Sequence, residues 1–101
     1  MTDPRGDQEL LAAAVTVPEH VVTRDFDREL VVLNLQSGEY HGLNPVGARM
    51  FEGLRTATAA AELVDPLVGE YGQPREVIEA DLVELLRALS ERGLVVLETP
   101  G

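Results

Sequence analysis

The sequence predicts an α+β fold, a winged helix-turn-helix in which a three-stranded antiparallel sheet is followed by three helices. Residues 20–43 are rich in β-forming side chains and contain two short turn segments, the pattern of a three-stranded meander. From Asn44 onward the apolar residues recur at helical spacing instead. The chain has 101 residues, 45% of them apolar, which suffices for one compact domain and is too short for two.

The N-terminal residues are expected to contribute little to this domain. Residues 1–9 are mostly polar, so residues 1–14 are expected to be disordered or weakly ordered and residues 15–98 to form the single domain. Within the first segment, the apolar residues 10–14 are compatible with a helical turn. A short strand is expected just after it, ended by Pro18.

Three strands are predicted before the helices. The first spans residues 20–26 and leads into a two-residue turn at residues 27–28. The second, residues 30–35, is nearly all apolar, which predicts a central strand covered on both faces or nearly so. Gly38 is expected in the left-handed conformation of a short bulged hairpin, after which residues 39–43 form the third strand.

Two helices are predicted next, and the second contains a proline. Asn44 is a favourable N-cap and Pro45 a favourable first residue for the first helix. The second helical pattern, residues 60–71, includes Pro66, and an interior proline costs about 3 kcal/mol in a regular helix. The sequence therefore leaves two possibilities, a kink at Pro66 or a separate short helix that starts there and is capped by Asp65.

The third and longest helix is predicted at residues 75–92. A wide apolar stripe runs along it, and Gly93 follows as a left-handed C-terminal stop. Residues 94–97 are apolar and are expected to fold back on the core as a short strand.

The charge balance limits the kinds of partner. The formal net charge is −10, and all eight basic residues are arginines, which disfavours nucleic acid and anionic membranes. Such acidity suits a partner with basic residues. Solubility is the alternative explanation and is sufficient by itself. The chain has no cysteine, no apolar run of membrane-spanning length and no hydrophobic targeting segment, so a cytoplasmic protein is expected.

Catalytic chemistry has little support. His20 and His41 are the only histidines and lie 21 positions apart without cysteines, so no metal site is expected. Asp25 and Asp27 flank a predicted turn and fit a solvated corner better than an acid–base pair. We therefore expect the protein to have no catalytic activity and to bind neither a cofactor nor a metal ion.

Recognition is the alternative to catalysis. A three-stranded sheet has two edges, and an exposed edge can accept an added strand. If residues 39–43 form an edge near the last helix, an extended peptide can pair with that strand and place alternate side chains against the helix. The absence of a side chain at Gly42 would let the backbone of a bound peptide approach the strand closely. Alternatively, Gly42 only marks a local twist or bulge of the strand.

Two segments resemble the PqqD-like family. Residues 31–48, VVLNLQSGEYHGLNPVGA, are similar to that family's strand–hairpin–strand–helix segment. Residues 80–94, ADLVELLRALSERGL, are similar to its last helix and its Arg-Gly-Leu stop. The resemblance extends over residues 15–96 and is greatest to the stand-alone leader-binding proteins of lasso-peptide biosynthesis. The proline in the middle helix departs from the family pattern.

The resemblance implies a RiPP recognition element, which binds the leader of a ribosomally made precursor peptide and delivers it to a leader protease or another modifying enzyme. The leader would add as a strand beside the third strand and pack against the last helix. The implied strand contacts are Glu39, Tyr40, His41, Gly42 and Leu43. The implied helix contacts are Ile78, Asp81, Leu82 and Leu85.

Several of these residues have a second interpretation. Asp81 would pair with a basic leader residue or is simply a solvated helix charge. Leu82 and Leu85 could both be plain core residues, and for Leu82 we favour that role. Tyr40 is expected to pack its ring and to place its hydroxyl near the groove.

Two other classes of function remain open. A winged-helix transcription regulator needs a basic recognition helix, but residues 75–92 carry three arginines against five acidic residues. A non-catalytic adaptor that dimerises through its sheet edge is compatible with the sequence.

Overall fold

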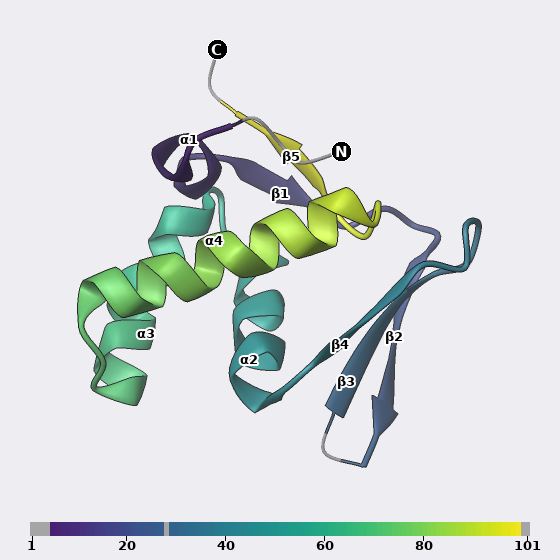
Figure 1. Ribbon diagram of the computed structural model, residues 1–101, viewed down its shortest axis with the longest axis horizontal. Coiled ribbons are helices and arrows are strands. Elements are labelled where there is room, and N and C mark those ends of the chain that lie inside the picture. Colours follow the sequence, from purple (N-terminus) through teal and green to yellow (C-terminus); the bar gives the residue numbers. More distant parts are fainter. Residues whose placement is uncertain (1–4, 28, 100–101) are drawn as a thin grey trace.

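The described part of the chain, residues 5–27 and 29–99 of a computed structural model, combines two small antiparallel sheets with helices (Figure 1). In chain order the elements are α1 (Asp7–Leu11), β1 (Ala14–Thr16), β2 (Val21–Phe26), β3 (Glu29–Asn34), β4 (Tyr40–Leu43), α2 (Pro45–Leu54), the 3₁₀ helix η1 (Ala60–Leu63), α3 (Val64–Tyr71), α4 (Arg75–Glu91) and β5 (Val96–Glu98). Figure 1 shows the larger sheet to one side of the helices, with α4 running from beside α3 toward the β3–β4 turn.

The larger sheet is an antiparallel meander in the order β2-β3-β4. β3 is therefore its central strand, and β2 and β4 are its edges. Gly38 has a φ of 81°, so the left-handed turn predicted between the last two strands is confirmed. In the turn predicted at residues 27–28, Asp27 has a φ of 53°, and Arg28 lies outside the described residues. The predicted α+β fold, with an antiparallel sheet ahead of the helices, is confirmed.

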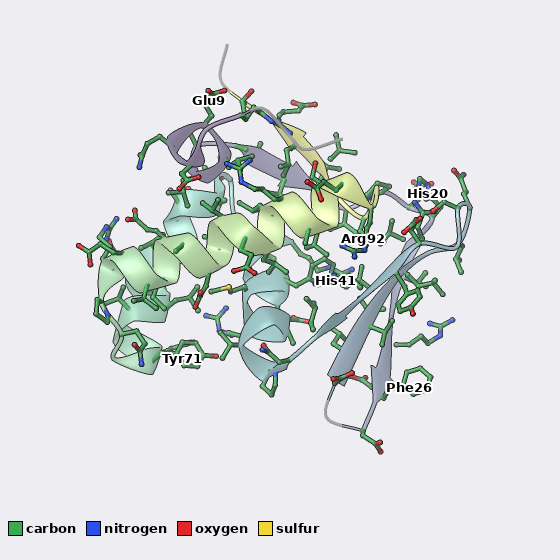
Figure 2. All side chains as sticks on the ribbon, viewed as in Figure 1. Glu9, His20, Phe26, His41, Tyr71 and Arg92 are labelled. Carbon is green, nitrogen blue, oxygen red and sulfur yellow. The ribbon has the colours of Figure 1, made fainter. Side chains whose placement is uncertain are left out.

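The two faces of this sheet differ in burial. On the face toward the helices Val32 is fully buried, whereas Val31 and Leu33 on the opposite face are half-buried. Phe26 and Tyr40 belong to that outer face and are each 65% exposed, and Figure 2 shows Phe26 pointing away from the helices. The apolar run of β3 suggested cover on both faces. Instead, only cross-strand neighbours shield its outer side chains in the described part of the chain.

The first helix and the proline-containing segment follow local chemistry. The Asn44 side chain accepts a hydrogen bond from the amide of Gly47 at 2.8 Å, and Pro45 is the first residue of α2, as predicted.

The segment with Pro66 divides into η1 and α3, so the helix is split and not kinked. Pro66 is the third residue of α3, where a missing N–H costs no intrahelical hydrogen bond. The break lies between Leu63 and Val64, two residues earlier than a cap at Asp65 would place it.

The core lies between α4, the other helices and the inner face of the meander. Its largest buried side chain is Phe51 of α2, which packs with the apolar stripe of α4. That stripe consists of Ile78, Leu82, Val83, Leu85, Leu86 and Leu89. Gly93 then stops the helix with a φ of 66°, and the amide of Leu94 donates to the carbonyl of Leu89 at 2.9 Å.

The N-terminal segment is more ordered than expected. Of the predicted disordered or weakly ordered residues 1–14, the first four lie outside the described residues, but α1 forms, and Leu10 and Ala13 are fully buried. β1 pairs antiparallel with β5, with Val15 opposite Leu97. Local sequence patterns could not reveal this pairing, because each strand has only three residues and its partner lies at the other end of the chain.

Candidate functional site

A groove runs between the edge strand β4 and the helix α4. One stretch of it has a volume of about 380 Å³ and is lined by His41, Gly42, Leu43, Asn44, Val46, Gly47, Met50, Asp81, Glu84, Leu85 and Ala88. A second hollow of about 490 Å³ is lined by Ser37, Gly38, Glu39, Tyr40, His41, Gly42 and Arg92. His41 and Gly42 line both, so the two hollows adjoin along β4, and together they are called the groove.

The backbone of β4 has hydrogen-bonding groups free for another strand. The amide of Asn34 donates to the carbonyl of Glu39 at 2.8 Å, so these two residues form a hydrogen-bonded pair. Antiparallel ladders alternate between bonded and non-bonded pairs, so His41 and Leu43 also face β3 with their amides and carbonyls. The amides and carbonyls of Tyr40 and Gly42 therefore point away from β3, toward the open edge.

The side chains of β4 alternate between the helix-facing side of the sheet and its outer face. Leu43 is buried on the helix-facing side and His41 is half-buried there, while Tyr40 lies on the outer face. The expected packing of the Tyr40 ring is not observed, because this ring is 65% exposed. Sequence alone could not fix which alternate residues face the helices, since both sets in this strand contain apolar or aromatic residues.

The predicted helix residues separate into two groups. Asp81 and Leu85 line the groove, whereas Ile78 and Leu82 are buried in the core and do not line it. Burial of Leu82 agrees with its interpretation as a core residue. Glu39 and Tyr40, predicted on the strand side, line only the second hollow.

Sequence reasoning missed nine groove residues, namely Ser37, Gly38, Asn44, Val46, Gly47, Met50, Glu84, Ala88 and Arg92. Val46 and Met50 were recognisable as part of the apolar face of α2. Which of these apolar residues reach the groove depends on how α2 packs beside α4, and no local pattern shows that. Glu84 and Ala88 follow Asp81 at helical spacing, so they share its face of α4 and that signal was available.

The ionisable groups of the groove are unevenly distributed, and its one arginine shares the second hollow with the exposed Glu39. Asp81 and Glu84 line the hollow beside the C-terminal end of β4. Arg92 and His41 lie together at the other end, under the C-terminal turn of α4 (Figure 2). Burial lowers the pKa of the His41 imidazole below its ordinary value, and the positive charge of Arg92 lowers it further. His41 is therefore neutral at pH 7, and Arg92 supplies the positive charge at that end.

Asn34 connects the two walls of the groove. Its carboxamide oxygen accepts from the amides of Gln36 and Ser37 at 2.9 and 3.1 Å in the β3–β4 turn. Its side-chain nitrogen donates to the carbonyl of Gly93 at 3.2 Å, at the stop of α4. This buried side chain thus holds the hairpin that carries β4 against the end of the helix opposite it.

Other kinds of site receive no support from the geometry. Among residues 5–27 and 29–99, no group of three or more histidine, aspartate and glutamate side chains is placed to hold a metal ion. In the same residues, no helix is both long enough and apolar enough to cross a membrane.

The meander, the three α-helices that follow it and the groove beside an open edge strand define a small domain of the PqqD type. The family profile described as coenzyme PQQ synthesis protein D (PqqD) matches residues 29–95, and the chain belongs to this family. The predicted family resemblance is thereby confirmed, with a profile match that begins further along the chain than residue 15. A search among curated proteins finds no significant match.

Two solved structures are similar over most of the chain. TbiB1, in complex with the TbiA(beta) leader peptide, is 38% identical and has a TM-score of 0.69, with 84% of this chain and 96% of that chain covered. A lasso peptide synthetase B1, complexed with the leader peptide, is 27% identical and has a TM-score of 0.74, with 83% and 99% covered.

Proposed function

We propose that this protein is a non-catalytic RiPP recognition protein that captures the leader of a precursor peptide by strand addition to β4. The captured leader lies in the groove between β4 and α4 and is delivered to a leader protease or another modifying enzyme. The observation that carries this proposal is the open edge of β4, which borders two adjoining hollows, the one beside Leu43 lined largely by apolar side chains.

Strand addition accounts for both the backbone and the side chains of the site. The outward amides and carbonyls of Tyr40 and Gly42 offer a peptide two donors and two acceptors. Alternate side chains of the added strand would then point toward the helices, where Leu85 and Ala88 of α4 and Met50 of α2 provide apolar contact. Because a disordered leader loses conformational entropy when it binds, we expect a Kd between about 10 nM and the low micromolar range.

The comparisons support this proposal. Both similar solved structures, TbiB1 and the lasso peptide synthetase B1, are complexes with a leader peptide. A DNA-binding role receives no comparable support. In α4, the helix that a winged-helix regulator would use, acidic side chains outnumber the arginines, and Asp81 and Glu84 line the groove.

The test is fluorescence anisotropy with a labelled leader peptide, taken from the N-terminal part of any short reading frame found adjacent to the gene. Gly42→Pro removes one outward amide without removing a bond of the β3–β4 ladder, and edge strands tolerate proline. We expect affinity to fall about tenfold or more, since one lost hydrogen bond and a steric obstruction cost about 1–2 kcal/mol.

A matched control lies on the other edge of the same sheet. Asp25 lies in a non-bonded pair of the β2–β3 ladder, so its amide also points away from β3. Asp25→Pro makes the same chemical change far from α4 and should leave affinity unchanged. Equal affinities of the Gly42→Pro and Asp25→Pro variants, both folded by circular dichroism, would contradict strand addition. No binding to the unmodified protein would contradict leader capture.

A further inference from the structure

The groove carries opposite charges at its two ends. Asp81 and Glu84 project from α4 beside Leu43, at the end where β4 leads into α2. Arg92 lies eight positions after Glu84, beside Tyr40 at the start of β4. An extended peptide lying along the groove would therefore meet two carboxylates at one end and, at the other, the guanidinium of Arg92 with the exposed Glu39 nearby.

These charges are available to a ligand. In the part of the chain that the structure describes, no ion pair joins Asp81, Glu84 or Arg92 to another side chain. The guanidinium of Arg92 makes one long contact, 3.5 Å, to the carbonyl of Ala88. Glu39 also lines the hollow of Arg92, but it is exposed and forms no ion pair with it. Arginines 49, 75 and 87 form ion pairs in the described part of the chain, and all three lie outside the groove lining.

The spacing of the charges matches the repeat of an extended chain. Eight helical positions between Glu84 and Arg92 correspond to about 12 Å at 1.5 Å per residue. A strand covers that distance in about four residues at 3.3 Å each. Four is an even number, so two peptide side chains four positions apart point to the same face. The side chain midway between them faces the apolar stretch at Leu85 and Ala88.

The direction of the peptide follows from the ladder type. β4 runs from the Arg92 end of the groove to the Asp81 end. Antiparallel pairing is the more stable and more frequent arrangement, so the added strand runs the opposite way. Its N-terminal part then lies beside Asp81 and Glu84, and its C-terminal part beside Arg92.

We propose, on the basis of the leader-binding function above, that the groove selects peptides with a basic residue, an apolar residue two positions later and an acidic residue two positions after that. The charges set both the register and the direction of the bound strand. The backbone groups of β4 alone cannot do this, because they are the same for every peptide sequence.

The first experiment is selection from a displayed library of random twelve-residue peptides. The unmodified protein serves as target and the Gly42→Pro variant as counter-target, so that only peptides dependent on the edge of β4 are kept. Enrichment of the basic–apolar–acidic order at this spacing supports the inference. Edge-dependent peptides with no charge order, or with the reverse order, overturn it and leave strand capture standing. Failure to select any edge-dependent peptide overturns both proposals.

The second experiment measures the charge contacts with two synthetic peptides of equal composition, in which the basic and acidic residues exchange places. We expect the unmodified protein to bind the basic-first peptide about tenfold more tightly, since two partly exposed pairs are exchanged for two repulsions. Arg92→Glu should abolish or reverse this preference. Arg24→Glu changes the net charge equally on the exposed outer edge strand and should retain it. An unchanged preference in the Arg92→Glu variant would refute the assigned register.

Discussion

Replacement of Asn34 tests whether one side chain holds the two walls of the groove together. Asn34→Ala removes three hydrogen bonds, two accepted from turn amides and one donated to the carbonyl of Gly93. Each such bond contributes about 0.5–1.5 kcal/mol net, and water can replace Asn34 at the exposed turn amides more easily than at Gly93. We therefore expect the free energy of unfolding to fall by about 2–3 kcal/mol, out of the 5–15 kcal/mol that is usual for a domain.

The assay is urea unfolding at pH 7, followed by circular dichroism. Ser37→Ala serves as a control in the same turn, because it removes only the exposed bond from the amide of Glu39 to the Ser37 hydroxyl, 3.2 Å long. We expect that control to cost less than about 0.5 kcal/mol. A loss below about 1 kcal/mol for Asn34→Ala, or equal losses in both variants, would refute the assigned role.

Asn34→Asp isolates the donor to Gly93. A carboxylate can still accept the two hydrogen bonds from the turn amides, but it has no proton to donate. At pH 7 the introduced side chain therefore cannot form the hydrogen bond to the Gly93 carbonyl. Only the protonated acid restores the bond, so the pKa of the introduced carboxyl should lie above its ordinary value. The stabilisation is then present below that pKa and lost as pH rises through it. The stability gap to the unmodified protein should therefore narrow as the pH is lowered, and a constant gap would count against the Asn34–Gly93 contact.

Three further predictions concern stability. Leu82→Ala, at a fully buried position, should cost about 2–5 kcal/mol in urea unfolding, while Val77→Ala on the same helix, at a position 41% exposed, should change stability by about 0.5 kcal/mol or less. His41, whose pKa is lowered by burial and by Arg92, binds its proton more weakly in the folded state. Stability should therefore fall as the pH drops through about 6.5, and His41→Gln should remove that part of the slope. Gly93→Ala, at a φ of 66°, should cost about 1–2 kcal/mol from backbone strain, and an unchanged melting temperature would contradict this.

The success of the sequence analysis depended on how local each signal was. Asn44 with Pro45, Gly38 and Gly93 each act on their own turn of chain, and each lies where the sequence predicted it. Pro66 was ambiguous because a first-turn proline and a kinking proline look the same until the start of the helix is known. The pairing of β1 with β5 depends on chain closure, which no short window of sequence contains.

The predicted groove residues also divide into those fixed by local sequence and those that depend on how distant elements pack. The edge position of β4 follows from a meander of three strands, so residues 39–43 could be placed beside the groove from the sequence. The parts played by Val46, Met50 and Arg92 could not, because they depend on the approach of α2 and of the α4 stop to the sheet. Ile78 and Leu82 were included because the apolar stripe of α4 is wider than the groove, and its buried half belongs to the core.

The ladder between β1 and β5 has a consequence for joining this domain to another protein. It brings the two ends of the described chain together on the side of α4 opposite the groove (Figure 1). Arg5 reinforces this closure by donating to the carbonyl of Leu97 at 3.2 Å. A second domain, a surface tether or a dye attached through a flexible linker at either end would leave the edge of β4 unobstructed. Because both attachment points lie side by side, exchanging one for the other would hardly change the distance from the attached group to a captured peptide.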